Sequence, residues 1–377
     1  MLNLKQKFDR WRINRYLKKA NLFYVSEDYM NALKLYQKIL CYEADNYAAY
    51  CNLATAYYEM ENYSDALPML EHLAKNDSSN PWWQTYLSKT YQNLSRFQEA
   101  LDAAWSAVII SDFASEHQIN LAYSFYEIAQ AKGADFVKEK LKEFYQLCPD
   151  SGIAKQCYFA FNFDKNFTQD DPEYVEKMFD IFAPEFDKVL SSLNYDSPKQ
   201  IACELASIIN DKNTELSLLD LGCGSGLCGA EVIKNYPYCQ IIGVDISALM
   251  LHQASLKNIY SQLIKKEITA YLESTKTLFD GIISADVLTY FGALDSLFLS
   301  VSHHLKSGGF FIFTISENNL NNNDYFLLSS SRFVHGFTYV ENVLSQAGFE
   351  LKSRHRIPLR REGEKDVIGG VFVAVKQ

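Results

Sequence analysis

The chain has 377 residues and a formal net charge of -10, with a sequence pI near 5.3. This acidic balance argues against a nucleic-acid-binding protein, because such binding draws its affinity mainly from Lys and Arg side chains that neutralise phosphates. The length allows two or three domains of roughly 100 to 200 residues each.

Several other classes of protein are excluded by what the sequence lacks. No apolar run reaches the roughly 18 residues of a membrane span, and the basic first 19 residues lack the apolar core and cleavage site of a secretory signal. The eight cysteines form no CxxC pair, so we expect free thiols in a reducing cytoplasm. The seven histidines show no metal-ligand spacing, and we expect no metal site.

The first part of the chain repeats with a period of 34 residues. Pairs of helices need small residues where they cross closely and a ring that fills the gap behind them. The period predicts helix pairs near 13–46, 47–80 and 81–114, with a degenerate fourth pair near 115–148. The columns are Ala20, Ala54, Ser88 and Ala122; Ala32, Ala66, Ala100 and Ala134; and Phe23, Tyr57, Tyr91 and Phe125.

These columns resemble the tetratricopeptide repeat, which implies an all-α helical repeat domain over residues 1–150. Stacked repeats bury their apolar faces against their neighbours and form a curved array with a concave groove. By this resemblance the groove binds a protein or peptide partner. Alternatively, the repeats dimerise the protein or shield the rest of the chain.

Residues 151–171 are expected to connect the repeats to a second domain over 172–377. Pro172 to Leu190 is predicted to be one helix, and Lys199 to Asn210 to be the helix before the first strand. Near the C-terminus, residues 349–358 and 367–375 are predicted to be antiparallel strands, with residues 360–365 as their turn.

A strand, a loop and a helix follow one another at residues 216–233. The apolar run Leu216 to Leu221 has the length of a buried parallel strand, and helical spacing begins at Leu227. Between them, Gly222, Gly224 and Gly226 remove every Cβ where a ligand must approach the backbone. The arrangement points free backbone N–H groups at whatever lies above the strand, so it predicts a nucleotide-cofactor loop. A tight turn without a ligand is the alternative.

A second β-rich run, residues 240–244, ends in Asp245 about twenty residues after the loop. An acidic side chain at such a strand end can accept hydrogen bonds from both ribose hydroxyls of a nucleotide. A dinucleotide dehydrogenase would use the same arrangement.

Here the sequence resembles the class I S-adenosylmethionine-dependent methyltransferases, and in particular a bacterial subgroup that carries tetratricopeptide repeats. Asp220 and the three glycines are similar to motif I of that family. Residues 279–288 resemble its fourth-strand motif, and residues 305–311 resemble the turn into its fifth strand. The resemblance covers about Met178 to the C-terminus. It implies a Rossmann-like α/β domain with a seven-stranded, mostly parallel sheet, and S-adenosyl-L-methionine as the cofactor.

The resemblance also assigns roles to individual residues. Glu267 is expected to accept a hydrogen bond from the adenine amino group, although a solvated surface charge is the alternative. Phe182 and Phe186 are expected to fold over the cofactor, unless both belong to the core. The expected cofactor-binding residues are Asp220, Gly222, Cys223, Gly224, Gly226, Asp245, Ile246, Glu267, Phe182 and Phe186.

Two catalytic residues are expected near the end of the fourth strand. Asp286 either orients the nucleophile or holds the amino group of the cofactor, and Tyr290 follows one helical turn later. A polar insertion, residues 318–337, lies where this fold builds its substrate wall. Within it, Arg332 and His335 either bind a substrate carboxylate or phosphate, or form a structural pair.

These residues predict methyl transfer from S-adenosylmethionine to a protein or a protein-presented acceptor, with the repeats as the partner-binding platform. One alternative is an O-methyltransferase that acts on a small carboxylate or on an acyl chain held by a carrier protein. A second alternative is a non-catalytic scaffold that binds the cofactor.

Overall fold

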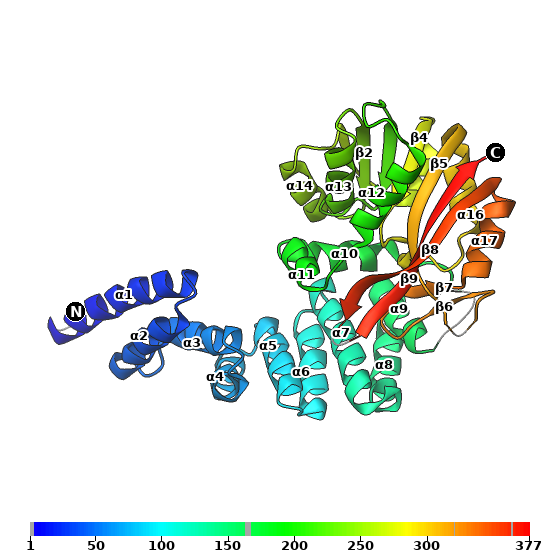
Figure 1. The fold of residues 1–377 in the computed structure, drawn as a ribbon. Helices are drawn as coiled ribbons and strands as arrows, with labels where there is room; N and C mark the ends of the chain where they lie inside the picture. Colours follow the sequence, from blue (N-terminus) through cyan, green and yellow to red (C-terminus); the bar gives the residue numbers. More distant parts are fainter. Residues whose placement is uncertain (1–3, 163–166, 320, 363–364) are drawn as a thin grey trace. The chain divides into compact units, whose positions relative to one another are not determined.

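The computed structural model describes residues 4–162, 167–319, 321–362 and 365–377 (Figure 1). The chain divides into two compact units, Met1–Lys140 and Leu141–Gln377, and each has its own hydrophobic core. The domain bounds expected from the sequence, 1–150, 151–171 and 172–377, stay a prediction. None of the described helices is long and apolar enough to cross a membrane.

The first unit is built from helix pairs with the predicted 34-residue period. Ala20, Ala54, Ala66 and Ala100 are completely buried, as close helix crossings require. The fourth pair departs from this pattern, because Ala134, which continues the column of Ala66 and Ala100, is exposed. The helices are α1 Leu4–Val25, α2 Tyr29–Tyr42, α3 Tyr47–Glu59, α4 Tyr63–Asn76, α5 Pro81–Asn93, α6 Phe97–Ile110, α7 Ser115–Lys132 and α8 Ala134–Leu147, the last of which crosses the unit boundary.

The turns inside the first three pairs repeat as well. Glu27, Glu61 and Ser95 all have positive φ, at 60°, 57° and 59°, and lie 34 residues apart. Side-chain caps start the helices that follow two of these turns: Asp28 accepts from the Asn31 amide and Asn62 from the Asp65 amide. The repeat is therefore encoded in the turns as well as in the packing columns.

The second unit contains, within its described residues, a seven-stranded sheet of order β3-β2-β1-β4-β5-β9-β8. The pairs among the first five of these strands are parallel, whereas β9 is antiparallel to both β5 and β8. This confirms the predicted Rossmann-like fold. The strands are β1 Ser217–Leu221, β2 Gln240–Asp245, β3 Gln262–Lys265, β4 Phe279–Ser284, β5 Leu305–Ser316, β8 Phe349–Glu362 and β9 Lys365–Lys376.

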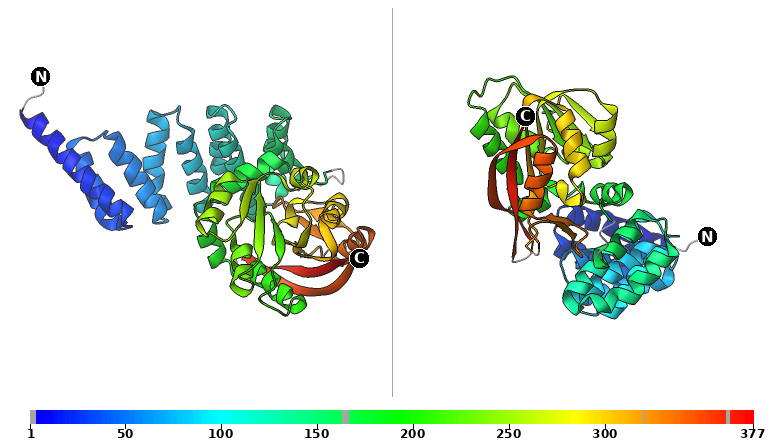
Figure 2. Two further views of the ribbon diagram at one scale, coloured as in Figure 1. Left: turned by 90° about the horizontal axis from the view of Figure 1, so that it is seen from above. Right: turned by 90° about the vertical axis from the view of Figure 1, so that its right-hand side faces the viewer.

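Helices cover both faces of this sheet (Figure 2). On β5 the side chains alternate between the faces. Phe310 and Ile312 join the cluster that contains α12 (Ser197–Ile208) and α13 (Leu227–Asn235). Phe311 and Phe313 instead pack on Phe298 of α16 (Asp295–His303), with ring centroids 5.4 and 5.1 Å apart. A sheet covered on both faces accounts for the near-continuous apolar strands.

Two predictions about local structure are wrong. Pro172 to Leu190 is not one helix but two, α10 (Pro172–Phe182) and α11 (Phe186–Ser192). Pro184 lies between them and lacks the backbone N–H that a continuous helix would need. Residues 360–362 and Lys365, which were expected in a turn, belong to strands, because β8 continues to Glu362 and β9 begins at Lys365; residues 363 and 364 of the expected turn lie outside the described residues. Arg360 is therefore a strand residue, and it is buried.

The segment expected to be a connector carries α9 (Gly152–Phe161), which packs within the second unit. Ala160 of α9 shares an apolar cluster with a hairpin formed by β6 (Tyr325–Leu327) and β7 (Phe333–His335), inside the predicted insertion. A helix that precedes the sheet in sequence and a hairpin inserted between β5 and β8 therefore share a small core.

We expect Phe298→Ala to destabilise the second unit by about 3 to 5 kcal/mol, because it leaves a cavity under two rings of β5. Its neighbour Leu299 is 47% exposed, so Leu299→Ala should change stability little. Urea denaturation separates the units, because all four tryptophans lie before residue 140 at Trp11, Trp82, Trp83 and Trp105. Circular dichroism should show an earlier transition in Phe298→Ala that tryptophan fluorescence does not share. A shift in both signals would contradict separate cores.

Candidate active site

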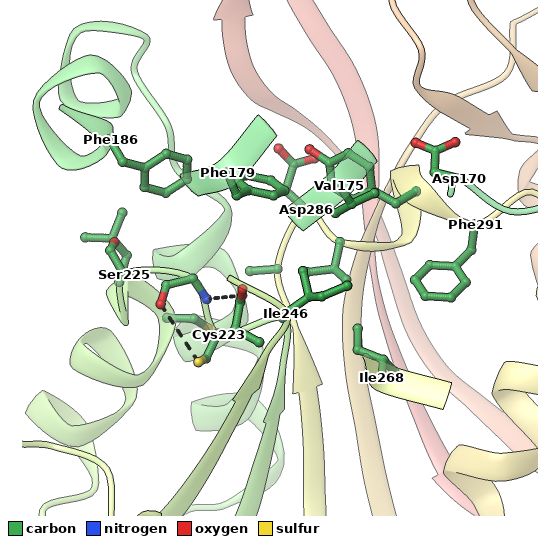
Figure 3. Close-up of a pocket in the computed structure, with 18 of the residues that line it drawn as sticks. Asp170, Val175, Phe179, Phe186, Cys223, Ser225, Ile246, Ile268, Asp286 and Phe291 are labelled. Atoms are coloured by element: carbon green, nitrogen blue, oxygen red, sulfur yellow. Dashed lines mark hydrogen bonds between the residues drawn. The ribbon is translucent and has the colours of Figure 1, made fainter. Parts of the chain in front are cut away.

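A cavity of about 190 Å³ lies at the carboxyl ends of the parallel strands (Figure 3). Gly222 follows β1, Asp245 ends β2 and Asp286 follows β4, and all three line the cavity. The volume is more than ten times the roughly 10 to 15 Å³ that one water needs on the same measure. The cavity therefore lies where α/β sheets bind their ligands, and it has room for a much larger molecule than water.

The glycine loop lines the cavity in a conformation that favours glycine. Gly222, Gly224 and Gly226 have φ values of 67°, 53° and 89°. A Cβ on Gly222 would collide with Val287. A Cβ on Gly224 would meet no atom closer than Phe186 Cε1 at 4.0 Å, so it would enter the open space of the cavity beneath that ring.

Asp245 holds this loop through hydrogen bonds from two backbone amides. Its Oδ2 accepts from the Gly224 N–H at 2.8 Å and its Oδ1 from the Ser247 N–H at 2.9 Å. The carboxyl is 8% exposed and lines the cavity. Burial raises its pKa to about 6, against the opposing effect of the amides. At neutral pH it is a carboxylate that can accept further hydrogen bonds from a ligand.

Asp220 lies beneath the loop and is absent from the lining of the cavity. The Tyr260 hydroxyl donates to its Oδ2 at 2.7 Å, whereas its Oδ1 has no hydrogen-bond partner among the described residues. Complete burial raises the pKa of Asp220 to about 7. A direct contact between Asp220 and a cofactor stays a prediction. The position of Asp220 beneath the loop, outside the lining of the cavity, does not support it.

Aromatic rings cover the cavity opposite the loop (Figure 3). Phe186 of α11 lines it, as expected, but Phe182 lies outside the lining and is 38% exposed. Phe179 of α10 takes that place, edge-on to Phe186 with centroids 6.0 Å apart and edge-on to Tyr290 at 5.5 Å. Val175 lies one turn before Phe179 and also lines the cavity, and this i, i+4 spacing was the available sequence signal.

Two aspartates tie the aromatic cover to the strand ends. Asp180 of α10 accepts a hydrogen bond at 2.6 Å from Ser247, which caps α14 (Ala248–Leu256). Asp187 of α11 accepts from the Ser225 hydroxyl of the glycine loop and pairs with Lys257 at 2.8 Å. The cover is therefore attached to the loops after both β1 and β2.

The rim after β3 carries Glu267 and the apolar lining residue Ile268, whereas Ile246 lines the cavity after β2. Glu267 caps α15 (Ile268–Ser274), because its Oε2 accepts from the Ala270 N–H at 2.8 Å. Its Oε1 accepts from Gln169 Nε2 at 3.4 Å. Glu267 thus lies on the cavity as expected, and its contact with adenine stays a prediction.

At the end of the cavity beyond β4, Asp286 forms a buried ion pair that the sequence did not indicate. Arg360 Nη1 donates to both carboxylate oxygens of Asp286, at 3.0 and 2.8 Å. Arg360 is 4% exposed and comes from β8. Tyr290 ends the short 3₁₀ helix Leu288–Tyr290 and lines the cavity. Burial raises its pKa to about 12.

The two predicted substrate-binding residues have different positions. Arg332 lines the cavity, but His335 does not and is completely buried. His335 Nε2 donates to the carbonyls of Phe291 and Gly292, at 2.8 and 3.1 Å. Burial lowers its pKa to about 4, so the ring is neutral. The structural role left open for His335 fits this position, whereas substrate binding does not.

Several lining residues escaped the sequence-based prediction. The polar ones are Gln169, Asp170, Tyr195, Lys266 and Arg360. Across the described residues, no group of three or more His, Cys, Asp or Glu side chains is placed to hold a metal ion.

Known proteins match both units in sequence. A family profile described as "Methyltransferase domain" matches residues 219–311, and one described as "Tetratricopeptide repeat" matches residues 26–90. Methyltransferase-like protein 27 of Homo sapiens is 28% identical over 153 residues, which are 40% of this chain and 62% of that protein.

Two bacterial relatives are similar over shorter stretches. Ribosomal RNA small subunit methyltransferase C of Haemophilus ducreyi is 30% identical over 128 residues, 32% of this chain and 37% of that one. Malonyl-[acyl-carrier protein] O-methyltransferase of Legionella pneumophila is 30% identical over 100 residues, 26% and 35% of the two chains. The chain thus spans between about a third and three fifths of the length of these relatives.

Among solved structures, 1,6-didemethyltoxoflavin-N1-methyltransferase of Burkholderia thailandensis, with bound S-adenosylhomocysteine, has a TM-score of 0.43. It is 15% identical and covers 54% of this chain and 89% of that one.

Residues 219–311 of the second unit match the methyltransferase domain profile, and the sheet order and the glycine loop agree with the fold expected from the sequence. In this chain a tetratricopeptide repeat region precedes that domain. The residues of the cavity fit the cofactor, because Gly224 leaves space that a Cβ would occupy and Asp245 presents a carboxylate beside it.

We expect Gly224→Val to abolish binding of S-adenosylmethionine and of S-adenosylhomocysteine. Its branched side chain would occupy the space beneath Phe186, and its backbone would be strained at positive φ. Wild-type affinity should be micromolar, roughly -8 kcal/mol. Calorimetry measures the binding, and unchanged tryptophan fluorescence checks that the repeats stay folded. Wild-type affinity in the variant would disprove the cofactor assignment.

Cofactor affinity should depend on pH through Asp245. Because burial raises its pKa to about 6, the carboxylate that we expect to accept the ribose hydroxyls is lost as pH falls through 6. Affinity for S-adenosylhomocysteine should be constant above pH 7 and weaken below 6, by at most about tenfold per pH unit. Asp245→Asn should bind weakly at every pH.

Asp220→Asn is the matched control, because its carboxyl has a raised pKa but lies outside the cavity. That variant should keep the weakening below pH 6. If Asp245→Asn keeps it as well, Asp245 is not the titrating group.

Proposed function

We propose that this protein transfers a methyl group from S-adenosylmethionine to a protein or a protein-presented acceptor, and that its repeats bind the partner. The observation that supports this most directly is the cavity between the Gly222–Gly226 loop and the Phe179–Phe186 cover, with Asp245 on its wall. The free thiols of all eight cysteines support a reducing cytoplasm as the compartment.

Separate groups of residues would hold the two ends of the cofactor. Asp245 and Ile246 would bind the ribose and adenine side, and the amino-acid part of the cofactor would approach the backbone of the glycine loop. S-adenosylmethionine, when bound, supplies a methyl group already activated for transfer by its sulfonium. The main tasks of the protein are therefore to position the acceptor and to exclude water, because the methyl donor needs no further activation.

The ion pair with Arg360 limits the chemical roles that are open to Asp286. With both oxygens engaged by Arg360, Asp286 is a fixed, neutralised group rather than a general base. Its amide donates to Thr314 Oγ1 at 2.8 Å, which fixes the backbone at its φ of 58°. We infer that Asp286 orients a bound group, whether the amino group of the cofactor or the acceptor. Phe179 and Tyr290, in contact with each other, keep water from this end.

A second candidate function is O-methylation of a small carboxylate or of an acyl chain on a carrier protein. Two observations favour it: Arg332 lines the cavity, and one sequence relative is a malonyl-[acyl-carrier protein] O-methyltransferase. This is a special case of the main proposal when the acyl chain is presented by a protein.

The role of the repeats can be tested with a fragment that begins at α8, Ala134–Gln377. It contains the whole sheet, α9 and the hairpin, so it should fold and bind the cofactor as tightly as the full chain. If the repeats recruit the acceptor, the fragment should label the physiological acceptor much more slowly.

The measurement compares labelling of cell proteins by the two forms with radioactive cofactor at equal saturation. Equal rates on the same acceptor would favour the alternative that the repeats dimerise the protein or shield the domain. Gel filtration of the two forms distinguishes these alternatives.

A further inference from the structure

Tyr260 packs beneath the glycine loop and does not line the cavity. It belongs to the segment between α14 and β3. Its hydroxyl donates a hydrogen bond to Asp220 Oδ2 at 2.7 Å, across 40 positions of the sequence. Asp220 lies near the end of β1, just before the loop begins at Gly222. This hydrogen bond therefore connects the segment before β3 to the strand that leads into the loop.

Three glycines leave room for the Tyr260 ring. A Cβ on Gly229, in the first turn of α13, would lie 2.6 Å from the Tyr260 hydroxyl oxygen. A Cβ on Gly226, or on Gly243 of β2, would lie 3.0 Å from a carbon of the ring. These distances are shorter than the roughly 3.5 to 4.0 Å at which non-bonded carbon atoms pack. The loop, α13 and β2 therefore form a slot that this ring fills.

The missing side chain at Gly226 serves this ring. A Cβ on Gly224 would enter the open space of the cavity, whereas Gly226 is absent from the lining of the cavity. The atoms nearest to a Cβ on Gly226 belong to Tyr260 and Ala254. A cofactor contact at Gly226 stays a prediction. Its close packing against Tyr260 gives a second reason for glycine at this position, besides its positive φ.

The Asp220 carboxyl depends on the Tyr260 hydroxyl. Asp220 is completely buried, and its Oδ1 has no hydrogen-bond partner among the described residues. Without the bond from Tyr260 a second buried oxygen would lose its partner, at a cost of roughly 1 to 3 kcal/mol. Only Leu221 separates Asp220 from Gly222. A displacement of this carboxyl would therefore move the start of the loop.

The glycine loop is thus held from two directions. Asp245 accepts from the Gly224 amide on the side of the cavity. On the other side, Tyr260 packs against Gly226 and bonds to Asp220. A binding site needs its groups placed to within about 0.5 Å, and residues outside the site supply this precision by packing and hydrogen bonding.

We propose that Tyr260 is a positioning residue of the cofactor site. Its ring and its bond to Asp220 hold residues 222–226 in the conformation that binds S-adenosylmethionine, so Tyr260 raises the affinity for the cofactor without touching it. This role does not depend on which acceptor the protein methylates or on what the repeats bind.

Calorimetry of the full chain with S-adenosylhomocysteine tests this role and needs no acceptor. Tyr260→Phe keeps the ring but removes the bond to Asp220, and Tyr260→Leu also empties the slot. The affinity should fall at least about threefold in Tyr260→Phe and at least about tenfold in Tyr260→Leu, as for residues that act on a site through another residue. Wild-type affinity in Tyr260→Leu would overturn the assignment. Wild-type affinity in Tyr260→Phe alone would overturn the part assigned to the hydroxyl.

Tyr236 is the matched control for a loss of stability alone. It is 1% exposed in the core on the same sheet, and its hydroxyl donates to the Ile209 carbonyl at 2.6 Å. Tyr236→Phe and Tyr236→Leu should lower the urea midpoint seen by circular dichroism, as the Tyr260 variants do, but keep wild-type affinity. Binding is measured far below each midpoint, so that every variant is folded. An equal loss of affinity in the Tyr236 variants would show that Tyr260 acts only through stability.

A further variant keeps the Tyr260 side chain and displaces it. Gly229→Ala places a Cβ against the hydroxyl, although alanine favours a helix by about 1 kcal/mol over glycine. It should weaken S-adenosylhomocysteine binding at least about threefold in the wild-type chain. In Tyr260→Leu the same change should have less than about a twofold effect, because the ring is gone. An equal loss in both backgrounds, or no loss in the wild-type chain, would overturn the role of the ring.

Discussion

The hydrogen bond from the Gly224 amide to the Asp245 carboxylate is the contact on which the site depends. It joins the loop after β1 to the end of β2 and holds a turn that contains three glycines at positive φ. The same carboxylate accepts from Ser247, which in turn donates to Asp180 of the aromatic cover. One buried acid thus links the floor, the wall and the cover of the cavity.

Elements with a local signature were predictable from the sequence. The 34-residue columns, the strand before Gly222 and the acid at the end of β2 are all patterns within a few residues or a fixed period. The wrong predictions have two causes: neighbouring residues that favour different local structures, and contacts between residues far apart in the sequence. Pro184 divides a segment that otherwise reads as helix, and Phe179 rather than Phe182 lines the cavity because it shares a face of α10 with Val175.

Partners that lie far apart in sequence left no such signature. Arg360 reaches Asp286 across 74 positions, and only the antiparallel pairing of β8 with β9 brings it there. His335 was a candidate substrate-binding residue because it lies in the polar insertion. Its ring instead donates hydrogen bonds to the carbonyls of Phe291 and Gly292. No pattern of residue spacing predicts this contact.

The two ends of the cavity have different origins in the chain. The glycine loop, Asp245 and Asp286 all lie inside residues 219–311, the stretch matched by the methyltransferase profile. Asp170 precedes that stretch, and Arg332 and Arg360 follow it. The matched stretch therefore supplies the end of the cavity at the glycine loop, whereas the end beside Tyr290 is assembled from segments that flank that stretch. Because those segments carry the charges that a ligand beside Tyr290 would meet, the acceptor is better inferred from their chemistry than from the substrates of relatives.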